Sequence, residues 1–444
     1  MKATFGTTKK GTWAYIQKSV RIDGKSTTKT VRRLGLLEDI RRKYGCQDPR
    51  QWVRDLAARM TEEEKAGRER ISVDFYPGQT VGMGDLPLRA GGDLMLLPLY
   101  NRLGLPRMCA EIKKASKAKF DLDGILRTLV TGRLLFPCSK QRTLRKAQGL
   151  VRPPKFGEAD MYRALSLLSG HIDDIQAGVY TCSARFMERR DRVIYYDCTN
   201  YYFEIEDNDR DTVDIETGEL VAGLRKRGKS KENRPSPIVQ MGMFMDMDGI
   251  PLAFVVFPGK ESEQATLQPL EDVLRRKFGL TEMVINDDIL GQEEKLDGFY
   301  AYATSLDDEA ALVLKARSFH HEIEHLFRTT KTHLEARPVY LSRQDRIRSH
   351  FLVCFLALLL LKLLQKQLAD SFPEAYKEHP LTVDQLIDTL QNLRFGQIQG
   401  LGYVPMFQRT SLTDQLQELA GVEVNKQIIT KAAMNAFYRK VNKG

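Results

Sequence analysis

Apolar and polar positions alternate along residues 12–35, and the alternation is interrupted once, at Asp23-Gly24. A period of two is typical of a strand with one buried face, and Asp-Gly is a common turn between two paired strands. The pattern therefore predicts a β-hairpin. A charged stretch at 48–67 follows the hairpin, and we expect it to be helical.

Residues 92–190 carry apolar positions at spacings of three and four, which predicts mostly helices. The character of the chain changes at Arg192, after which short apolar runs alternate with helical patterns. The expected strands are 193–205, the two halves of 238–259 on either side of Asp248-Gly249, 281–287 and 298–305. The expected helices are 266–279, 307–334 and 343–369, and 381–444 is expected to be mainly helical. Three strands followed by alternating helix and strand is the order of a ribonuclease-H-like sheet.

The predicted fold class is therefore α/β, with a ribonuclease-H-like mixed sheet and flanking helices. We expect four parts in the 444 residues. They are a basic β-hairpin with a helix (1–91), a helical domain (92–190), the domain of the mixed sheet (191–342) and a C-terminal helical region (343–444).

The net charge of +10 is concentrated in two places. Residues 1–33 contain nine Lys and Arg against one acid, and 223–235 contains six basic residues and one Glu. Localised positive charge suits a polyanion, although a solvated basic face is the alternative. The candidates for contact with nucleic acid are Lys9, Lys10, Arg225, Lys226, Arg227, Lys229, Lys231 and Arg234.

The cysteine pattern and the apolar runs predict in which cellular compartment the protein is found. Six scattered cysteines without a CxxC pair argue against a disulfide scaffold and a thiolate zinc site, and fit a reducing compartment. The N-terminus lacks the apolar region of a signal peptide. The longest apolar run, 351–361, is short for a membrane span, so we expect a buried core helix and no membrane association.

Three acidic positions stand out in this pattern: Asp197 within the first expected strand, Asp287 or Asp288 at the end of a later one, and Glu324 on a long helix. A carboxylate among Tyr and Ile is costly to bury unless a cation or a hydrogen-bond donor compensates it. Mg²⁺ is a cation that binds carboxylate oxygens. The alternative for Asp197 is a structural role at the end of a strand.

Several motifs carry a resemblance to a known family. They are YYDCTNYYFE (195–204), GKSKENRPSPIVQMGMFMDMDGIPLAF (228–254), IEHLFRTTKTHLEARPVYL (323–341), DRIRSHFLVCFLALLLLKLL (345–364) and LRFGQIQGLGYVP (393–405). The chain resembles bacterial insertion-sequence transposases of the DDE type, in the branch with a Tyr-x2-Arg-x3-Glu-x6-Lys signature. The resemblance implies cleavage at transposon ends and strand transfer by the freed 3′-hydroxyl. It also implies two Mg²⁺ ions as cofactors, for which Mn²⁺ can substitute. The implied partner is double-stranded DNA, both at the transposon ends and at the target. The implied protein is a homodimer on paired ends, associated with the nucleoid in the bacterial cytoplasm.

The resemblance assigns the catalytic, metal-binding carboxylates to Asp197, Asp288 and Glu324, with Asp287 as the other candidate for the second position. Lys331 matches the signature Lys, and Arg328 shares its helix face, so both are expected to contact DNA phosphates. Where the signature has Tyr and Arg, this chain has Arg317 and His320. Only 35 residues separate Asp288 from Glu324, so the chain resembles a family member shortened before the catalytic Glu.

Two other functions compete with this interpretation. One is a transposase derivative that binds DNA without catalysis and inhibits transposition. The other is a zinc metallopeptidase, because His321, Glu322 and His325 form H-E-x-x-H, with His350 as an available third ligand.

Overall fold

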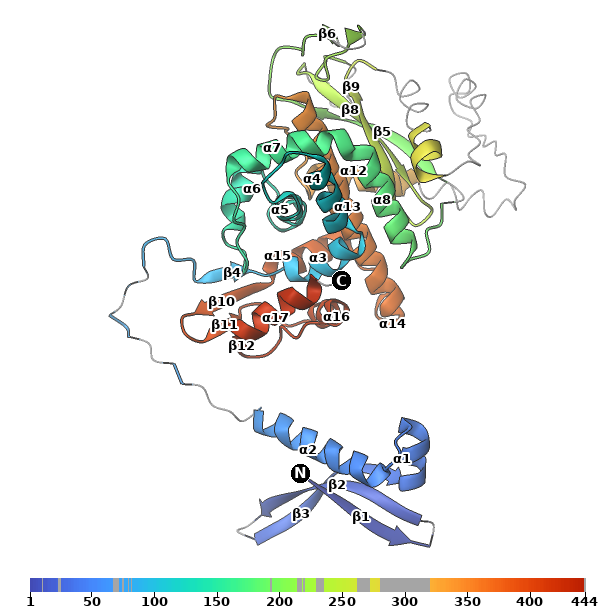
Figure 1. Cartoon of the computed structure of the whole chain (residues 1–444), viewed down its shortest axis with the longest axis vertical. Helices are drawn as coiled ribbons and strands as arrows, with labels where there is room; N and C mark the ends of the chain where they lie inside the picture. Colours follow the sequence, from blue (N-terminus) through green and yellow to red (C-terminus); the bar gives the residue numbers. More distant parts are fainter. Residues whose placement is uncertain are drawn as a thin grey trace, which may run out of the picture. The chain divides into compact units, whose positions relative to one another are not determined.

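The structure is a computed structural model of the chain (Figure 1). It describes residues 1–9, 11–22, 25–66, 72–73, 76–78, 80, 82–191, 194–213, 218, 220–228, 235–261, 272–279 and 320–442. Contacts divide the chain into two compact units, Met1–Met83 and Gly84–Gly444. Each unit is described by itself below.

The first unit is a three-stranded antiparallel sheet with two helices. Its elements are β1 (Lys2–Thr8), β2 (Gly11–Ile22), β3 (Lys25–Leu36), α1 (Leu37–Tyr44) and α2 (Pro49–Ala66). The strand order is β1-β2-β3, so the predicted hairpin of β2 and β3 and the predicted helix at 48–67 are confirmed. Ala14, Ile40 and Val53 form the buried centre between sheet and helices. The sequence analysis did not predict β1, which pairs with β2 along its whole length.

Helices dominate residues 92–190 of the second unit, as the period of three and four predicts. Its first elements are β4 (Leu88–Ala90), α3 (Asp93–Arg102), α4 (Leu105–Ala115), α5 (Leu122–Leu135), α6 (Lys140–Ala147), α7 (Glu158–Leu168) and α8 (Ile172–Ala184). Side chains cap two of these helices: Asp121 accepts a bond from the amide of Gly124, and Ser139 accepts one from the amide of Arg142.

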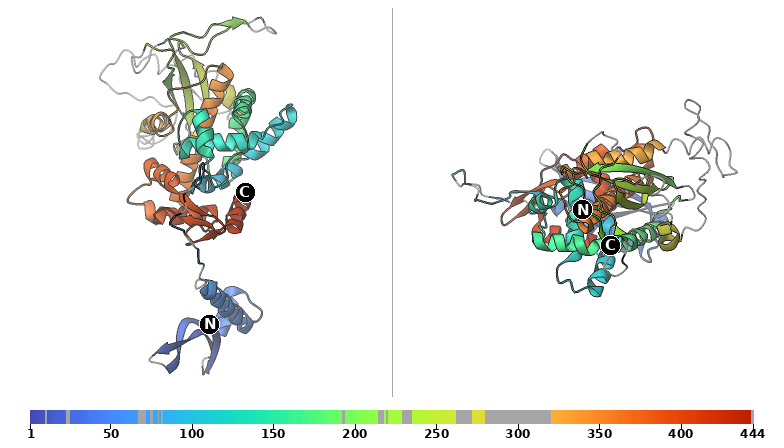
Figure 2. Two further views of the ribbon diagram at one scale, coloured as in Figure 1. Left: turned by 90° about the vertical axis from the view of Figure 1, so that its left-hand side faces the viewer. Right: turned by 90° about the horizontal axis from the view of Figure 1, so that it is seen from above.

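The long helix α13 (Gln344–Ser371) is the centre of this unit. It lies against α5, α7 and β9, and Figure 2 shows its surroundings from two further sides. Its length and mean hydropathy are those of a membrane span, but 94% of its most apolar window is buried inside the protein. The predicted core helix at 343–369 is therefore confirmed.

The segment 191–342 contains β5 (Tyr195–Tyr202), β8 (Ile238–Met245), β9 (Pro251–Pro258) and the helix α12 (His320–Thr332) in its described part. The three strands are antiparallel in the order β5-β8-β9, and Gly249, with φ 69°, closes the predicted turn between β8 and β9. A separate short hairpin consists of β6 (Thr212–Val213) and β7 (Leu220–Val221). Residues 272–279, at the end of the predicted helix 266–279, include the helical turn Leu274–Phe278. The predicted strands 281–287 and 298–305 and the helix before residue 320 lie outside the described residues.

Residues 381–444 are mainly helical, as expected, and the region also contains short strands that the sequence analysis did not predict. Its elements are α14 (Pro373–Tyr376), α15 (Val383–Asn392), β10 (Arg394–Ile398), β11 (Gly402–Pro405), α16 (Ser411–Ala420), β12 (Ile429–Thr430) and α17 (Lys431–Val441). The strands form a second sheet in the order β12-β11-β10-β4, in which Arg394 of β10 pairs with Ala90 of β4.

One hydrophobic core joins the later segments of the chain. The largest buried cluster includes Leu94 of α3, Val239 of β8, Leu326 of α12, Phe355 of α13 and Tyr438 of α17. The segments that the sequence analysis treated as 92–190, 191–342 and 343–444 therefore share one core in their described parts.

Candidate functional site

The strand β5 presents Asp197 on the face that α12 covers. Residues two apart on a strand share a face, so Asp197, Thr199 and Tyr201 belong together. Lys331 of α12 fixes which face this is, because its Nζ donates a 2.6 Å hydrogen bond to Thr199 Oγ1 and lies 5.6 Å from the centre of the Tyr201 ring. Asp197 is half-buried, and its Oδ1 accepts a 2.7 Å bond from the amide of Cys198.

The helix α12 runs in the same direction as β5. Near its start, Glu322 Oε2 lies 3.5 Å from the position of a Cβ at Gly249, in the turn that follows β8. That turn adjoins the pair Tyr195–Met245 at the beginning of β5, whereas Lys331 near the helix end contacts Thr199. Glu324 precedes Lys331 by about 10 Å of helix rise. Asp197 precedes Thr199 by about 7 Å of strand, so both carboxylates belong to the same end of the α12–β5 contact.

Two flanks of α12 have different neighbours. Its buried face contains Ile323, Leu326, Phe327 and Thr330. By helical periodicity Glu324, Arg328 and Lys331 lie on one side of this face, next to β5. Glu322 and His325 lie on the other side, where Glu322 pairs with Lys362 of α13 at 3.6 Å.

Glu324 and Arg328 are exposed, whereas Lys331 is half-buried against β5. The ammonium of Lys331 packs on Thr199 and Tyr201, and its contact with DNA phosphate stays a prediction. The sequence analysis missed Thr199 as a neighbour of the site. The period of two along β5 was the signal that could have found it, because it places Thr199 on the face of Asp197.

The carboxylates of Asp197 and Glu324 are the type of ligand that Mg²⁺ binds, and one or two protein carboxylates are usual when substrate phosphates complete the coordination. Among the residues that the structure describes, no group of three or more His, Cys, Asp or Glu lies together. Asp288, Asp287 and Arg317 lie outside the described residues, and His320 is the first residue of α12.

The basic segment 223–235 is partly neutralised by acids of the chain itself. Arg225 binds Asp209 through Nε at 2.8 Å, and Lys226 Nζ lies 2.7 Å from Asp211. The hydrogen bond from Lys226 lowers the pKa of Asp211. Arg225 and Lys226 therefore pair with acids of the chain itself, and their contact with DNA stays a prediction.

Of the other residues predicted to contact DNA, some are exposed and the rest lie outside the described residues. Arg227 is exposed and donates to the carbonyl oxygen of Glu206 at 2.9 Å. Lys9 is exposed at the end of β1. Lys10, Lys229, Lys231 and Arg234 lie outside the described residues.

The zinc-peptidase interpretation finds little support around α12. Burial and the positive charge of Lys362 lower the pKa of His325. Its neighbour Glu322, which would be the general base, already pairs with that lysine. His350, a buried residue of α13, has its Nε2 3.0 Å from the carbonyl oxygen of Ala336.

The chain matches no family model, and comparisons with curated proteins and with solved structures give no match. The functional argument therefore depends on the residues themselves.

Proposed function

We propose that the chain is a DDE-type DNA transposase that cleaves transposon ends and transfers the strand to target DNA. One observation carries the proposal: Lys331 of α12 donates a hydrogen bond to Thr199 of β5. Helix and strand rise then assign Glu324 and Asp197 to the same end of this strand–helix contact. The H-E-x-x-H motif then has no catalytic meaning, because its Glu322 lies on the opposite flank of the helix.

The described strands support a ribonuclease-H-like arrangement for the catalytic domain. Three antiparallel strands in the order β5-β8-β9 place the first strand at one end of the described sheet. The predicted strand 281–287, which ends at Asp287-Asp288, lies outside the described residues.

The reaction consists of two displacements at phosphorus. Water attacks the phosphodiester at a transposon end, and the bond to the 3′-oxygen breaks, which leaves a 3′-hydroxyl. This hydroxyl then attacks a phosphodiester of the target and displaces the 3′-oxygen of the target strand. Two bound Mg²⁺ ions, held by Asp197, Asp288 and Glu324, would stabilise charge on the attacking and leaving oxygens.

Arg328 and Lys331, on the side of α12 next to β5, hold the substrate and the helix in place. Arg328 is exposed one turn after Glu324, so it is placed to contact a phosphate of bound DNA. Lys331 fixes α12 on β5, and it thereby holds Glu324 in register with Asp197. The exposed basic residues Lys9 and Arg227 would add salt-dependent phosphate contacts. The partner is double-stranded DNA in a bacterial cytoplasm, with a homodimer assembled on paired ends.

The two glutamates of α12 offer a matched test. We would incubate the purified chain with duplexes that carry the inverted repeats flanking its gene, in Mg²⁺ or Mn²⁺, and separate the products on denaturing gels. We expect Glu324→Gln to reduce cleavage and strand transfer at least about 100-fold, because it removes a metal ligand. Glu322→Gln, two residues away, is expected to retain most of the activity.

The reverse result, with activity lost in Glu322→Gln and kept in Glu324→Gln, would refute the assignment. Duplex binding by the wild-type chain without any cleavage would instead favour the non-catalytic DNA-binding derivative. Metal analysis of protein purified without chelators tests the peptidase alternative. That function requires bound zinc, so protein without zinc would refute it.

A further inference from the structure

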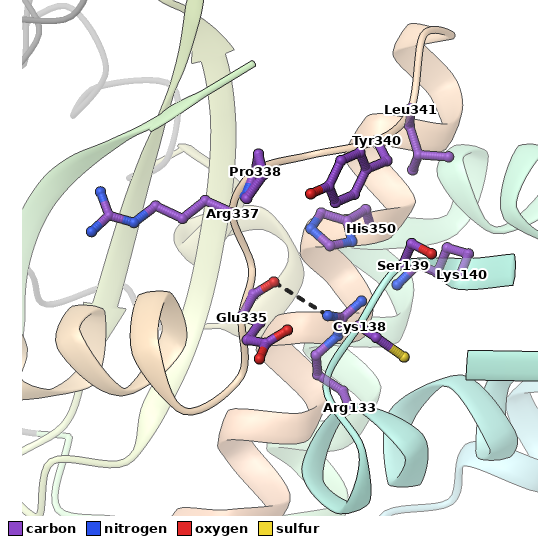
Figure 3. Close-up of a pocket in the computed structure, with 10 residues that line it drawn as sticks. All are labelled: Arg133, Cys138, Ser139, Lys140, Glu335, Arg337, Pro338, Tyr340, Leu341 and His350. Carbon is purple, nitrogen blue, oxygen red and sulfur yellow. Dashed lines mark hydrogen bonds between the residues drawn. The ribbon is translucent and has the colours of Figure 1, made fainter. Parts of the chain in front are cut away.

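A small pocket lies where α5 and α6 meet the segment that follows α12 and the start of α13 (Figure 3). Its volume is about 70 Å³, and the residues that matter for its chemistry are Arg133, Ser139, Lys140, Tyr340 and His350. Figure 3 shows that Arg337, which also lines it, extends away from the others. The pocket is separate from the α12–β5 contact, and the proposed function uses none of these residues.

Two cations are buried at this pocket. Lys140 is 4% exposed and Arg133 is 2% exposed. Arg133 is partly satisfied, because Nη1 donates to the carbonyl oxygens of Leu334 at 3.1 Å and Glu335 at 3.3 Å. Its Nε and the Nζ of Lys140 have no hydrogen-bond partner among the described residues.

The surroundings disfavour the positive charge of Lys140. Burial lowers the pKa of Lys140 well below its usual value, and the neighbouring Arg133 guanidinium lowers it further. Burial and the same two cations lower the pKa of His350. The thiols of Cys138 and Cys354 act weakly in the other direction on Lys140. Within the described part of the chain, Glu335 is the one acidic residue in the pocket lining, and it is exposed.

A buried, unsatisfied ammonium is costly and is rarely kept unless something binds it. We propose that this pocket binds one oxyanion of the phosphate class, which Lys140 and Arg133 hold as an ion pair. The start of α6 adds to the attraction, because Lys140 is its first residue and helix N-termini favour anions. The small volume suits a single tetrahedral anion.

Two molecules can supply a phosphate group to this pocket: free inorganic phosphate, or a polynucleotide through its backbone. The site itself does not depend on the proposed function, because burial and charge alone define it. A polynucleotide phosphate would make the pocket an additional anchor for DNA.

The first experiment measures thermal unfolding of the full chain in rising inorganic phosphate, against chloride at matched ionic strength. Phosphate stabilises most proteins through exclusion from their surface, so the variants decide the result. Lys146 is an exposed lysine on the same helix, so Lys146→Met is the control. We expect phosphate to raise the unfolding temperature of wild type and of Lys146→Met by several degrees more than that of Lys140→Met. An equal gain in all three proteins would overturn the proposal.

A direct measurement on the wild-type chain keeps the test independent of how the variants fold. Isothermal titration with inorganic phosphate should show saturable binding of one anion per chain, and absence of saturable binding would overturn the site. Fluorescence anisotropy with a labelled duplex then separates the sources. Competition by inorganic phosphate together with weaker duplex binding by Lys140→Met assigns the site to DNA, and unchanged duplex binding assigns it to the free anion.

Discussion

Two buried cations of the same unit have opposite surroundings. The side chain of Arg189, after α8, is 2% exposed, and its Nε lies 2.7 Å from Oδ2 of Asp246, which is fully buried. The same guanidinium donates to Ser183 Oγ at 2.8 Å and to the carbonyl oxygen of Pro251 at 3.1 Å. Lys140 is buried almost as completely, yet its Nζ has no hydrogen-bond partner among the described residues.

The difference separates a structural role from a binding role. Asp246 also accepts hydrogen bonds from the backbone amides of Asp248 at 3.0 Å and Ile250 at 2.9 Å. The ion pair therefore stabilises the turn between β8 and β9. A fully satisfied network of this kind rigidifies one arrangement. Lys140 stabilises nothing in the described structure by its charge, and a ligand is the physical reason to keep it.

The largest expected effect comes from breaking the satisfied pair. Arg189→Met leaves the Asp246 carboxylate buried without its cation, which should cost about 3–5 kcal/mol of unfolding free energy. Arg190→Met is the matched control, since the side chain of Arg190 is 47% exposed and its pairing with Asp248 at 3.4 Å is worth under about 1 kcal/mol. Chemical denaturation of both variants measures the difference, and equal losses would contradict the structural role.

A buried carboxylate held by a hydroxyl and by backbone amides should lie between the two cases. Asp93 on α3 accepts bonds from Tyr438 Oη at 3.1 and 3.0 Å, and burial raises its pKa from 3.8 to about 6. Because the folded state binds this proton more tightly than the unfolded state, its contribution is complete below about pH 4 and is lost as pH rises through about 6.

Asp93→Asn cannot ionise at this position, so the part of the pH dependence of stability that Asp93 supplies should disappear. The variant should exceed wild type in stability above pH 6 by up to about 3 kcal/mol, which is the pKa difference converted to free energy. Denaturation curves at several pH values check this, with Asp388→Asn as an exposed control on α15. A wild-type profile that Asp93→Asn leaves unchanged would exclude Asp93 as the titrating group.

The smallest effect has the opposite sign to the first. In buffer without phosphate, Lys140→Met removes an unsatisfied buried amine and keeps the apolar stem, so stability should rise by about 1–2 kcal/mol. Lys146→Met should change it by less than about 0.5 kcal/mol, as exposed substitutions usually do. Unfolding free energies of the two variants measure the contrast, and a loss in Lys140→Met would give Lys140 the structural role of Arg189.

Local patterns predicted much of what the structure describes. The alternation around Asp23-Gly24 predicted the hairpin of β2 and β3, and the apolar run at 351–361 predicted the buried helix α13. Strand β1 was missed because it is short and partly polar, and its pairing with β2 supplies what its own sequence lacks. The pair of β4 with β10 was missed because no local pattern links Ala90 to Arg394.

The candidate site divides in the same way. The sequence by itself placed Asp197 on a strand and Glu324 on a helix, since these follow from strand and helix periods within a few residues. Their candidacy as metal ligands came from the resemblance of the motifs around them. Only the tertiary structure decided that Lys331 binds Thr199, that Arg225 and Lys226 are neutralised by Asp209 and Asp211, and that Lys140 is buried without a partner. The physical reason is that burial and ion pairing depend on which distant segments pack together, and a charge has the same letter in the sequence whether water, a carboxylate or nothing surrounds it.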